Sequence, residues 1–346
     1  MRTLTYRDGI NEALHEEMAT DPSVFVYGID VSDHKRIFGT TKNLVEDFGE
    51  ERCFSTPLAE DTLVGFGLGA ALTGQRPVNV HMRVDFLLLA MNQLFNMVTT
   101  WPYGSGGSLK VPLVIRAIIG RGWGQSYQHS KSLQSMFAHF PGLRVVMPAT
   151  PADAKGMLKA AIRCDDPVLV LEHRWLYDAE GQVGGADETT SLEGAAVLRP
   201  GTDLTIAATS WMNVEAMHAA SILARAGVSC EVVDIRSVAP LDDATVAMSV
   251  AKTGYCIVAD TDWVPYGLGA ELAARLHDTC FGMLKAPVKR VGFAFTHCPS
   301  ARPLENLFYP NARSIVREAE ALLDLPPADL DGEDFYSYEK KFRGPF

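Results

Sequence analysis

The sequence has little basic charge and no long apolar run. Its 346 residues hold 42 acidic against 31 basic side chains, which gives a formal net charge of −11. An acidic chain without a dense Lys/Arg cluster is not expected to bind nucleic acid. The longest uninterrupted apolar run is Phe86–Met91, whereas a membrane span needs about 20 such residues. Neither a nucleic-acid partner nor a membrane partner is therefore predicted.

Cysteine is scarce, and its spacing excludes two kinds of site. The six cysteines lie far apart and form no CxxC pair, so neither a disulfide framework nor a zinc site is predicted. The first eight residues are polar, and no apolar stretch follows them, so no secretory signal is expected. These features together predict free thiols in a soluble protein of the cytoplasm.

A phosphate-binding loop is also lacking. The chain has no GxxxxGK[ST] motif and no glycine fingerprint between a strand and a helix. Gly65–Gly69 falls inside a helical pattern, which indicates close helix packing, and Gly120–Gly124 indicates a mobile loop after a strand. A nucleotide-dependent oxidoreductase that uses either stretch stays open as a disfavoured hypothesis.

What is present is an alternation of helical and β-branched segments. The length suggests about two domains, and 47% of the residues are hydrophobic. Strands are expected at 24–27, 77–80, 111–119, 144–147 and 167–172, and helices at 10–18, 63–72, 86–98 and 151–163. Strands separated by helices predict right-handed βαβ units, and hence an α/β fold with doubly wound parallel sheets.

The alternation of strand and helix patterns is interrupted and then resumes, which predicts a domain boundary. Residues 178–201 are rich in glycine and acids and show no period, so the boundary is placed near residue 190. After it, strands are expected at 203–208, 228–234, 256–260 and 288–291, and helices at 214–225, 242–251, 268–277 and 313–323. The predicted parts are a first domain at 1–176, a linker at 177–200, a second domain at 201–330 and a tail at 331–346. The tail is polar and aromatic, typical of a loose end or a docking arm.

Several motifs follow one another in a characteristic order. They are STPLAE at 55–60, EDTLVGFGLGAAL at 60–72, RPV at 76–78, QHS at 128–130, PGLRVV at 141–146, DPVLVLE at 166–172 and EVVDIRSVAPLD at 231–242. In this order and spacing the chain resembles the β subunit of thiamine-diphosphate-dependent 2-oxoacid dehydrogenases. These are the decarboxylating first components of the pyruvate and branched-chain complexes. The resemblance spans about residues 3–325.

The resemblance implies a fold, a cofactor and partners. It implies a transketolase-like pyrimidine-binding domain followed by a transketolase C-terminal-type domain, in an oxidoreductase that decarboxylates a 2-oxoacid. Thiamine diphosphate is expected with its pyrimidine end on this chain. Its diphosphate and Mg²⁺ are expected on a separate α subunit, in an assembly of two α and two β chains. The acyl unit is expected to pass to the lipoyl arm of a dihydrolipoyl acyltransferase core or to another acceptor.

The resemblance also assigns roles at the cofactor. Glu60 matches the catalytic glutamate, whose carboxyl group hydrogen-bonds N1′ of the aminopyrimidine and favours the tautomer that accepts the thiazolium C2 proton. An acid suited to a helix N-terminus is the alternative interpretation of Glu60. Leu58 and Phe86 are implied to bind the cofactor, and Phe86 packs on the pyrimidine ring. The alternative for Phe86 is ordinary core packing.

Further residues are implied to serve substrate and structure. His129 of the QHS motif matches an active-site histidine that stabilises a developing alkoxide or orients the substrate carboxylate. A hydrogen-bonded loop histidine is the alternative, and His139 is interpreted as structural. Asp166 and the carbonyl groups of Ala161 and Cys164 fall where the family often holds a K⁺ ion.

Some positions depart from the family pattern. Ile29 and Val80 stand where acids are usual, Trp101 lies in a segment that replaces a usual Ala-Ala-Lys, and Trp123 and Tyr127 make the stretch before QHS bulkier. The departures fit either a rearranged charge network or a remodelled acyl pocket lined by the aromatic residues. They keep two other functions open, a carboligase or acyl-transferring subunit of specialised metabolism and a non-catalytic stabilising subunit.

Overall fold

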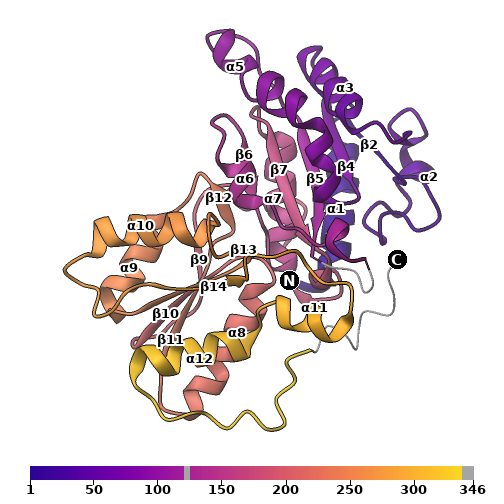
Figure 1. Cartoon of the computed structure of the whole chain (residues 1–346). Helices are drawn as coiled ribbons and strands as arrows, with labels where there is room; N and C mark the ends of the chain where they lie inside the picture. Colours follow the sequence, from indigo (N-terminus) through magenta and orange to yellow (C-terminus); the bar gives the residue numbers. More distant parts are fainter. Residues whose placement is uncertain (121–124, 337–346) are drawn as a thin grey trace. The chain divides into compact units, whose positions relative to one another are not determined.

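The computed structural model describes residues 1–120 and 125–336, and its contacts divide the chain into two compact units. Unit 1 comprises Met1–Ile119 and Met136–Leu192, and unit 2 comprises Gly120–Ser135 and the chain from Glu193 onward. Each unit is an α/β structure, so the predicted fold class is confirmed (Figure 1). The segment at 120–135 belongs with the second unit, although it lies within the first half of the sequence.

The sheet of unit 1 is parallel, as the βαβ pattern predicts. Six strands of this unit follow the order β6-β7-β5-β4-β2-β3. Their bounds are β2 Val24–Gly28, β3 Cys53–Ser55, β4 Arg76–His81, β5 Val114–Ile119, β6 Arg144–Val146 and β7 Val168–His173. All six residues of β5 and all six of β7 are buried, as expected for central strands that are covered on both faces.

Helices α1 (Tyr6–Thr20) and α7 (Pro151–Arg163) pack against each other in unit 1. Each begins at a threonine whose hydroxyl accepts a backbone N–H three residues later, Thr5 from Asp8 and Thr150 from Asp153. The ammonium group of Lys155 on α7 lies 2.8 Å from the carboxylate of Glu16 on α1. This ion pair joins two helices that are far apart in sequence.

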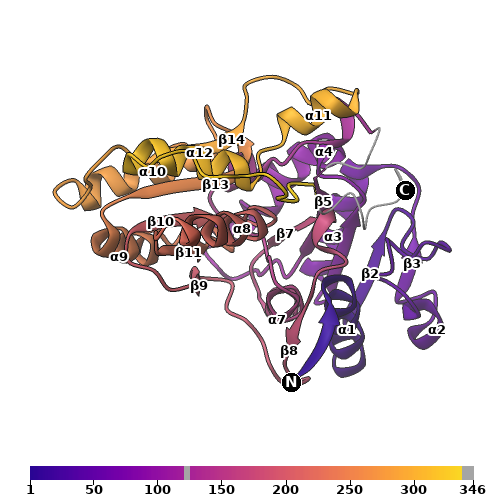
Figure 2. The ribbon, with the colours of Figure 1, turned by 90° about the horizontal axis from the view of Figure 1, so that it is seen from below.

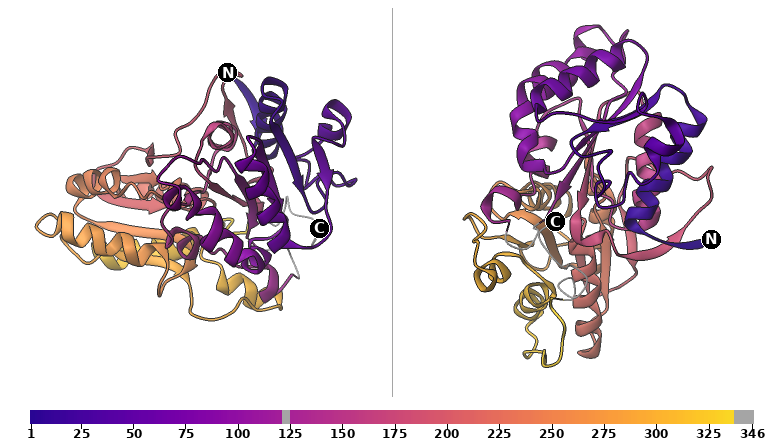
Figure 3. Two further views of the ribbon diagram at one scale, coloured as in Figure 1. Left: turned by 90° about the horizontal axis from the view of Figure 1, so that it is seen from above. Right: turned by 90° about the vertical axis from the view of Figure 1, so that its right-hand side faces the viewer.

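The predicted linker at 177–200 is more ordered than its composition suggests. Strand β8 (Glu180–Val183) pairs antiparallel with β1 (Arg2–Thr5), and the N-terminus lies at this pair in Figures 2 and 3. Strand β9 (Ala196–Arg199) joins the sheet of unit 2. Pairing with strands distant in sequence supplies the order, and local composition does not reveal such pairing.

The helix expected at 86–98 is present, but it is wound in three ways. It runs as α4 (Val84–Leu87), a 3-10 turn (Leu88–Ala90) and a π-helical stretch (Asn92–Val98). The hydroxyl groups of Thr99 and Thr100 donate to the carbonyl groups of Phe95 and Asn96. Such side-chain bonds compete with the regular backbone ladder at the end of a helix.

Unit 2 holds a sheet in the order β14-β13-β10-β11-β9. Its strands are β10 Leu204–Ala208, β11 Cys230–Asp234, β13 Cys256–Trp263 and β14 Lys289–Phe293, which are parallel, together with the antiparallel β9. Figure 1 shows α9 (Asp243–Thr253) and α10 (Leu268–Cys280) on one face of this sheet. It shows α8 (Met212–Arg225) and α12 (Ala312–Leu323) on the other. The shorter elements are α2 Leu44–Phe48, α3 Glu60–Leu72, α5 Trp101–Gly104, α6 Gln134–Ala138, β12 Ser237–Ala239 and α11 Arg302–Phe308.

The described part of the tail docks on unit 2. Phe335 is buried in the core formed by α8, α12 and the sheet, and the carboxylate of Glu333 lies 2.7 Å from Nε2 of His218 on α8. The part of the tail up to Tyr336 is therefore a docking arm, one of the two predicted alternatives. Residues 337–346 lie outside the described part.

Candidate functional site

Glu60 is the first residue of α3, and it follows directly on the loop after strand β3. Its N-cap residue is Ala59, whose side chain cannot cap the helix. The Glu60 side chain is only 8% exposed, yet its carboxyl group has no hydrogen-bond partner among the described residues. A carboxyl group at a largely buried residue, with no partner in the chain, is open to a hydrogen bond with a bound group. This geometry fits the ring nitrogen of an aminopyrimidine.

The side chains predicted to accompany Glu60 are exposed apolar groups. Leu58 is 77% exposed and Phe86, on α4, is 38% exposed. Large apolar side chains on a monomer surface mark binding or association sites when they gather around a polar group. Both lie on short segments at the carboxyl ends of parallel strands, Leu58 after β3 and Phe86 after β4, where open α/β sheets bind their ligands.

The glycines of α3 place Glu60 by letting the helix approach the sheet closely. A Cβ atom at Gly67 would lie 2.3 Å from the Tyr27 hydroxyl oxygen and 2.9 Å from a methyl group of Leu113. The same hydroxyl donates a 2.7 Å hydrogen bond to the Leu63 carbonyl group. The prediction that Gly65–Gly69 serves close helix packing is confirmed at Gly67. The second glycine stretch, at 120–124, lies outside the described residues apart from Gly120.

His129 lies in unit 2, at the end of a 3-10 turn formed by Tyr127–His129. The residue that precedes the turn, Ser126, has φ +59°, a conformation that non-glycine residues rarely adopt. Its hydroxyl oxygen lies 2.6 Å from the hydroxyl oxygen of Ser300, and Tyr309 donates a 2.9 Å hydrogen bond to the Ser130 carbonyl group. Contacts on both sides of His129 therefore fix this segment.

Positive charge and neutral imidazoles gather at the carboxyl ends of β4 and β7 in unit 1. Burial lowers the pKa of His81 to about 4, and burial with the nearby Arg83 lowers the pKa of His173 to about 3. Burial and Arg83 also lower the pKa of Arg174 to about 9, and its guanidinium lies 4.3 Å from the Phe38 ring centroid. Both histidines are therefore neutral at pH 7.

One strong interaction of unit 1 has no counterpart in the sequence-based prediction. Arg116 on β5 contacts both carboxylate oxygens of Glu172 on β7, at 2.5 and 2.9 Å, and Tyr177 donates to the same carboxylate at 2.8 Å. The available signal was a lone arginine in the apolar run VPLVIRAII beside the acid of DPVLVLE. Those strands are neighbours in the sheet.

The sequence analysis also did not single out two carboxylates of unit 2. Asp260 and Asp262 are buried near the carboxyl end of β13, in a strand whose other residues are largely apolar. Burial and the nearby charge of Asp262 raise the pKa of Asp260 to about 7, and burial raises the pKa of Asp262. The signal was the alternation in ADTDW, which places both acids on one face of a strand.

The residues proposed for K⁺ are engaged by guanidinium groups. Arg76 donates to the carbonyl group of Cys164 at 3.0 Å, and Arg144 donates to the Asp166 carboxylate at 3.0 Å. The carbonyl group of Ala161 accepts the backbone N–H of Cys164 at the end of α7. Within residues 1–120 and 125–336, no group of three or more His, Cys, Asp or Glu side chains is arranged to hold a metal ion. A K⁺ ion at these carbonyl groups stays a prediction.

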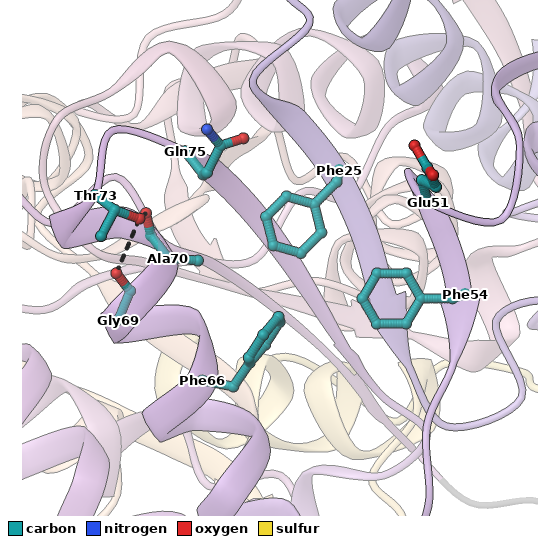
Figure 4. Close-up of a pocket in the computed structure, with 8 residues that line it drawn as sticks. All are labelled: Phe25, Glu51, Phe54, Phe66, Gly69, Ala70, Thr73 and Gln75. Atoms are coloured by element: carbon teal, nitrogen blue, oxygen red, sulfur yellow. Dashed lines mark hydrogen bonds between the residues drawn. The ribbon is translucent and has the colours of Figure 1, made fainter.

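A shallow aromatic hollow lies elsewhere on unit 1. It has a volume of about 580 Å³, and its wall includes the rings of Phe25, Phe54 and Phe66, which Figure 4 shows converging from β2, β3 and α3. Glu51 is the one ionisable side chain that lines it. The other residues that line it are the uncharged Gly69, Ala70, Thr73 and Gln75.

The aromatic residues of the predicted acyl pocket are distributed over both units. Trp101 begins α5 in unit 1, whereas Tyr127 belongs to unit 2 and is about half exposed. Trp123 lies outside the described residues. Val80 is buried at the end of β4, next to the neutral His81, whose Nε2 lies 2.6 Å from the Asn79 side-chain oxygen. A neutral hydrogen-bonded pair thus stands beside Val80, the position at which the family resemblance implies an acid.

Comparison with known proteins identifies the family. The transketolase pyrimidine-binding domain matches residues 2–179, and the transketolase C-terminal domain matches residues 193–315. The chain is 39% identical to the 2-oxoisovalerate dehydrogenase subunit beta of Bacillus subtilis, over 94% of this chain and 100% of the relative. It is 38% identical to the acetoin:2,6-dichlorophenolindophenol oxidoreductase subunit beta of Cupriavidus necator, over 92% and 97%.

The solved structures agree on the fold. A split gene transketolase, described as an inactive β4 tetramer, aligns with a TM-score of 0.75 at 24% identity, over 94% of this chain and 99% of that one. The fold and the two family matches thus define a transketolase-like pair of domains. The chain belongs to the family of β subunits of heteromeric thiamine-diphosphate-dependent 2-oxoacid dehydrogenases.

The location of the protein is less closely defined. None of the described helices is long and apolar enough to cross a bilayer. Plant relatives are named as mitochondrial or chloroplastic proteins, such as pyruvate dehydrogenase E1 β subunits of Oryza sativa. A cytoplasmic location stays a prediction from the sequence.

Proposed function

We propose that this chain, with an α partner, decarboxylates a 2-oxoacid and passes on the acyl unit. The observation that carries the proposal is Glu60, a buried residue at the start of α3 whose carboxyl group has no hydrogen-bond partner among the described residues. Thiamine diphosphate, when bound, would supply the nucleophilic carbon and the electron sink that decarboxylation of a 2-oxoacid needs.

The residues of this chain have separate tasks in the proposal. Glu60 holds a proton on a carboxyl oxygen and donates it to the ring nitrogen N1′ of the cofactor pyrimidine. Phe86 and Leu58 supply apolar surface that excludes water from that ring. His129 donates an N–H to the oxygen that gains negative charge, or orients the substrate carboxylate.

The rest of the site is assigned to the α partner. Within residues 1–120 and 125–336, no group of three or more His, Cys, Asp or Glu side chains is arranged to hold a metal ion, and the sequence contains no GxxxxGK[ST] loop. We therefore propose that the α subunit holds the diphosphate and Mg²⁺, in an assembly of two α and two β chains. A lipoyl group on a dihydrolipoyl acyltransferase core is the proposed acceptor.

The electrostatics of unit 1 favour an anionic substrate. The guanidinium groups of Arg83 and Arg174 lie near the neutral His173, at the carboxyl ends of β4 and β7. A 2-oxoacid carries a carboxylate that suits such a region. Acetoin, named for one relative, is an uncharged hydroxyketone and is the second candidate substrate.

The test is reconstitution with the α subunit. We expect thiamine-dependent release of ¹⁴CO₂ from 1-¹⁴C-labelled 2-oxoacids, lost on the substitution Glu60→Gln, with the neighbouring Asp61→Asn as the matched control. Full activity of Glu60→Gln would contradict the assigned mechanism. Cofactor binding without turnover of any 2-oxoacid, but with cleavage of acetoin, would favour the second substrate class. A reconstituted pair that binds no thiamine diphosphate would favour the non-catalytic subunit.

A further inference from the structure

The segment that carries His129 is tied to strand β13 of the same unit by two side chains. The amide nitrogen of Gln134 donates a 2.7 Å hydrogen bond to Asp260, and the hydroxyl group of Ser135 donates a short hydrogen bond to Asp262. Gln134 is fully buried, and it stands only five residues after His129. Asp260 and Asp262, which were not predicted from the sequence, therefore contact the segment that bears the predicted active-site residue His129.

The two carboxylates accept several donors each, which holds them in place. The Asp260 oxygen that Gln134 contacts also accepts the Thr209 hydroxyl group and the backbone N–H of Thr261. Asp262 accepts the backbone N–H of Trp263 at 2.8 Å. Several hydrogen bonds to one carboxyl group fix its orientation at the end of the strand.

This arrangement is unfavourable for stability alone. Two acids with raised pKa values share a buried strand end, with desolvation and mutual repulsion opposing their ionisation. Aliphatic residues on β13 would pack there at no such cost. Costly buried charge at the carboxyl end of a strand, next to a functional segment, is characteristic of a functional site.

We propose that Asp260 and Asp262, acting through Gln134 and Ser135, are positioning residues that fix the orientation of His129 toward the 2-oxoacid. The inference rests on the proposed function, because it concerns the substrate-facing histidine of that reaction. Asp260 and Asp262 do not touch the substrate themselves. They fix the far end of the segment, while Tyr309 and Ser300 hold it near Ser126 and Ser130.

Gln134→Met and Asp260→Asn in the reconstituted αβ holoenzyme test this role. Gln134→Met removes the amide donor and keeps the side-chain length. Because a displacement of about 1 Å at a catalytic group can cost about 100-fold in rate, we expect kcat to fall about 10- to 100-fold. The dissociation constant for thiamine diphosphate is expected to stay within about twofold of wild type.

The matched control is Glu215→Gln. Glu215 is a buried acid of the same unit whose pKa burial raises to about 7, and it accepts from Trp211 Nε1 and the backbone N–H of Ala312. It contacts α12 and not the His129 segment. We expect Glu215→Gln to lower the melting temperature while kcat stays near wild type. Equal kcat values for Gln134→Met, Glu215→Gln and wild type would overturn the inference.

A paired substitution separates positioning from general loss of structure. Gln134→Glu alone places a third acid against the pair, whereas Gln134→Glu with Asp260→Asn restores a donor–acceptor pair of reversed polarity. We expect the kcat of the double variant to be at least tenfold higher than that of Gln134→Glu alone. Additive losses would overturn the proposed coupling.

Amide hydrogen exchange gives a readout that needs no turnover. We expect faster exchange confined to residues 126–135 in Gln134→Met holoenzyme, and none of it in Glu215→Gln. Unchanged exchange in this segment would overturn the inference. Failure of the proposed function would look different, because the wild-type holoenzyme would release no CO₂ and His129→Ala would change nothing.

Discussion

The guanidinium group of Arg116 and the carboxylate of Glu172 form a two-contact ion pair in which each side chain is only 1% exposed. The pair joins β5 to β7 in the middle of the unit 1 sheet, and the hydroxyl group of Tyr177 completes it. Its attraction offsets the desolvation of two charges only while both partners are present.

Removing one partner of this pair should therefore be severe. We expect Glu172→Gln to lower the free energy of unfolding by about 3–5 kcal/mol, because an uncompensated guanidinium stays buried. Urea unfolding followed by circular dichroism measures the change. The exposed pair Arg275–Glu271 on α10 is the control, and Glu271→Gln should cost less than about 1 kcal/mol. Similar losses for both substitutions would contradict this account.

Substitution of two glycines of α3 by alanine should change the stability of the protein in opposite directions, so each variant is a control for the other. Gly67→Ala would press a methyl group against the Tyr27 hydroxyl group and Leu113, so we expect a loss of about 1–3 kcal/mol in the free energy of unfolding. A Cβ atom at Gly69 meets open space, so Gly69→Ala should stabilise the helix by up to about 1 kcal/mol. Thermal melts of the two variants, compared side by side, test the opposite signs.

Phe86 should contribute to cofactor affinity. We expect Phe86→Ala to raise the dissociation constant of the holoenzyme for thiamine diphosphate about tenfold, because an aromatic contact contributes about 1 kcal/mol or more. Titration of intrinsic fluorescence against the cofactor measures it. Phe66→Ala, at an exposed phenylalanine of α3 in the aromatic hollow, is the control and should leave the constant unchanged. If both substitutions weakened the binding of thiamine diphosphate, the effect of Phe86→Ala would be attributed to folding and not to contact with the cofactor.

The buried acid Asp260 predicts a pH dependence of stability. Its pKa is about 7 in the folded chain against 3.8 for an ordinary aspartate, so between these values the folded state binds more protons than the unfolded state. The contribution of this group to the free energy of unfolding therefore falls as the pH rises from about 4 to about 7. Asp260→Asn should flatten this part of the stability–pH curve, measured by urea midpoints. An unchanged slope would show that Asp260 ionises normally.

The sequence predicts the fold well where a signal is local. Helix Pro151–Arg163 has the bounds expected from its proline and its apolar spacing, and β5 follows from its apolar run. Strand β8 and the π-helical turn at Asn92–Val98 were not predicted, because they depend on a distant strand and on threonine hydroxyl bonds. Local pattern carries no information about either partner.

The candidate site was likewise predictable from the sequence only in part. Glu60, Phe86 and His129 are predicted because their motifs resemble a known family, and the structure adds the burial of Glu60. The contact between Gln134 and Asp260 joins residues 126 positions apart, so no motif contains both. Paired charges such as Arg116 and Glu172 were likewise hidden, since each looks like an isolated exception within an apolar strand.

The placement of residues 120–135 with the second unit has a consequence for cutting and recombining the chain. The family match to the pyrimidine-binding domain runs through residue 179, so a fragment that ends near residue 190 carries the His129 segment but leaves its anchors Asp260, Asp262 and Tyr309 behind. A chimera of two relatives joined at that boundary would pair one parent's histidine with the other parent's supports. The substrate preference of such hybrids should therefore depend on how well the His129 segment of one parent fits the anchoring residues of the other. It should not depend on which parent supplied either half.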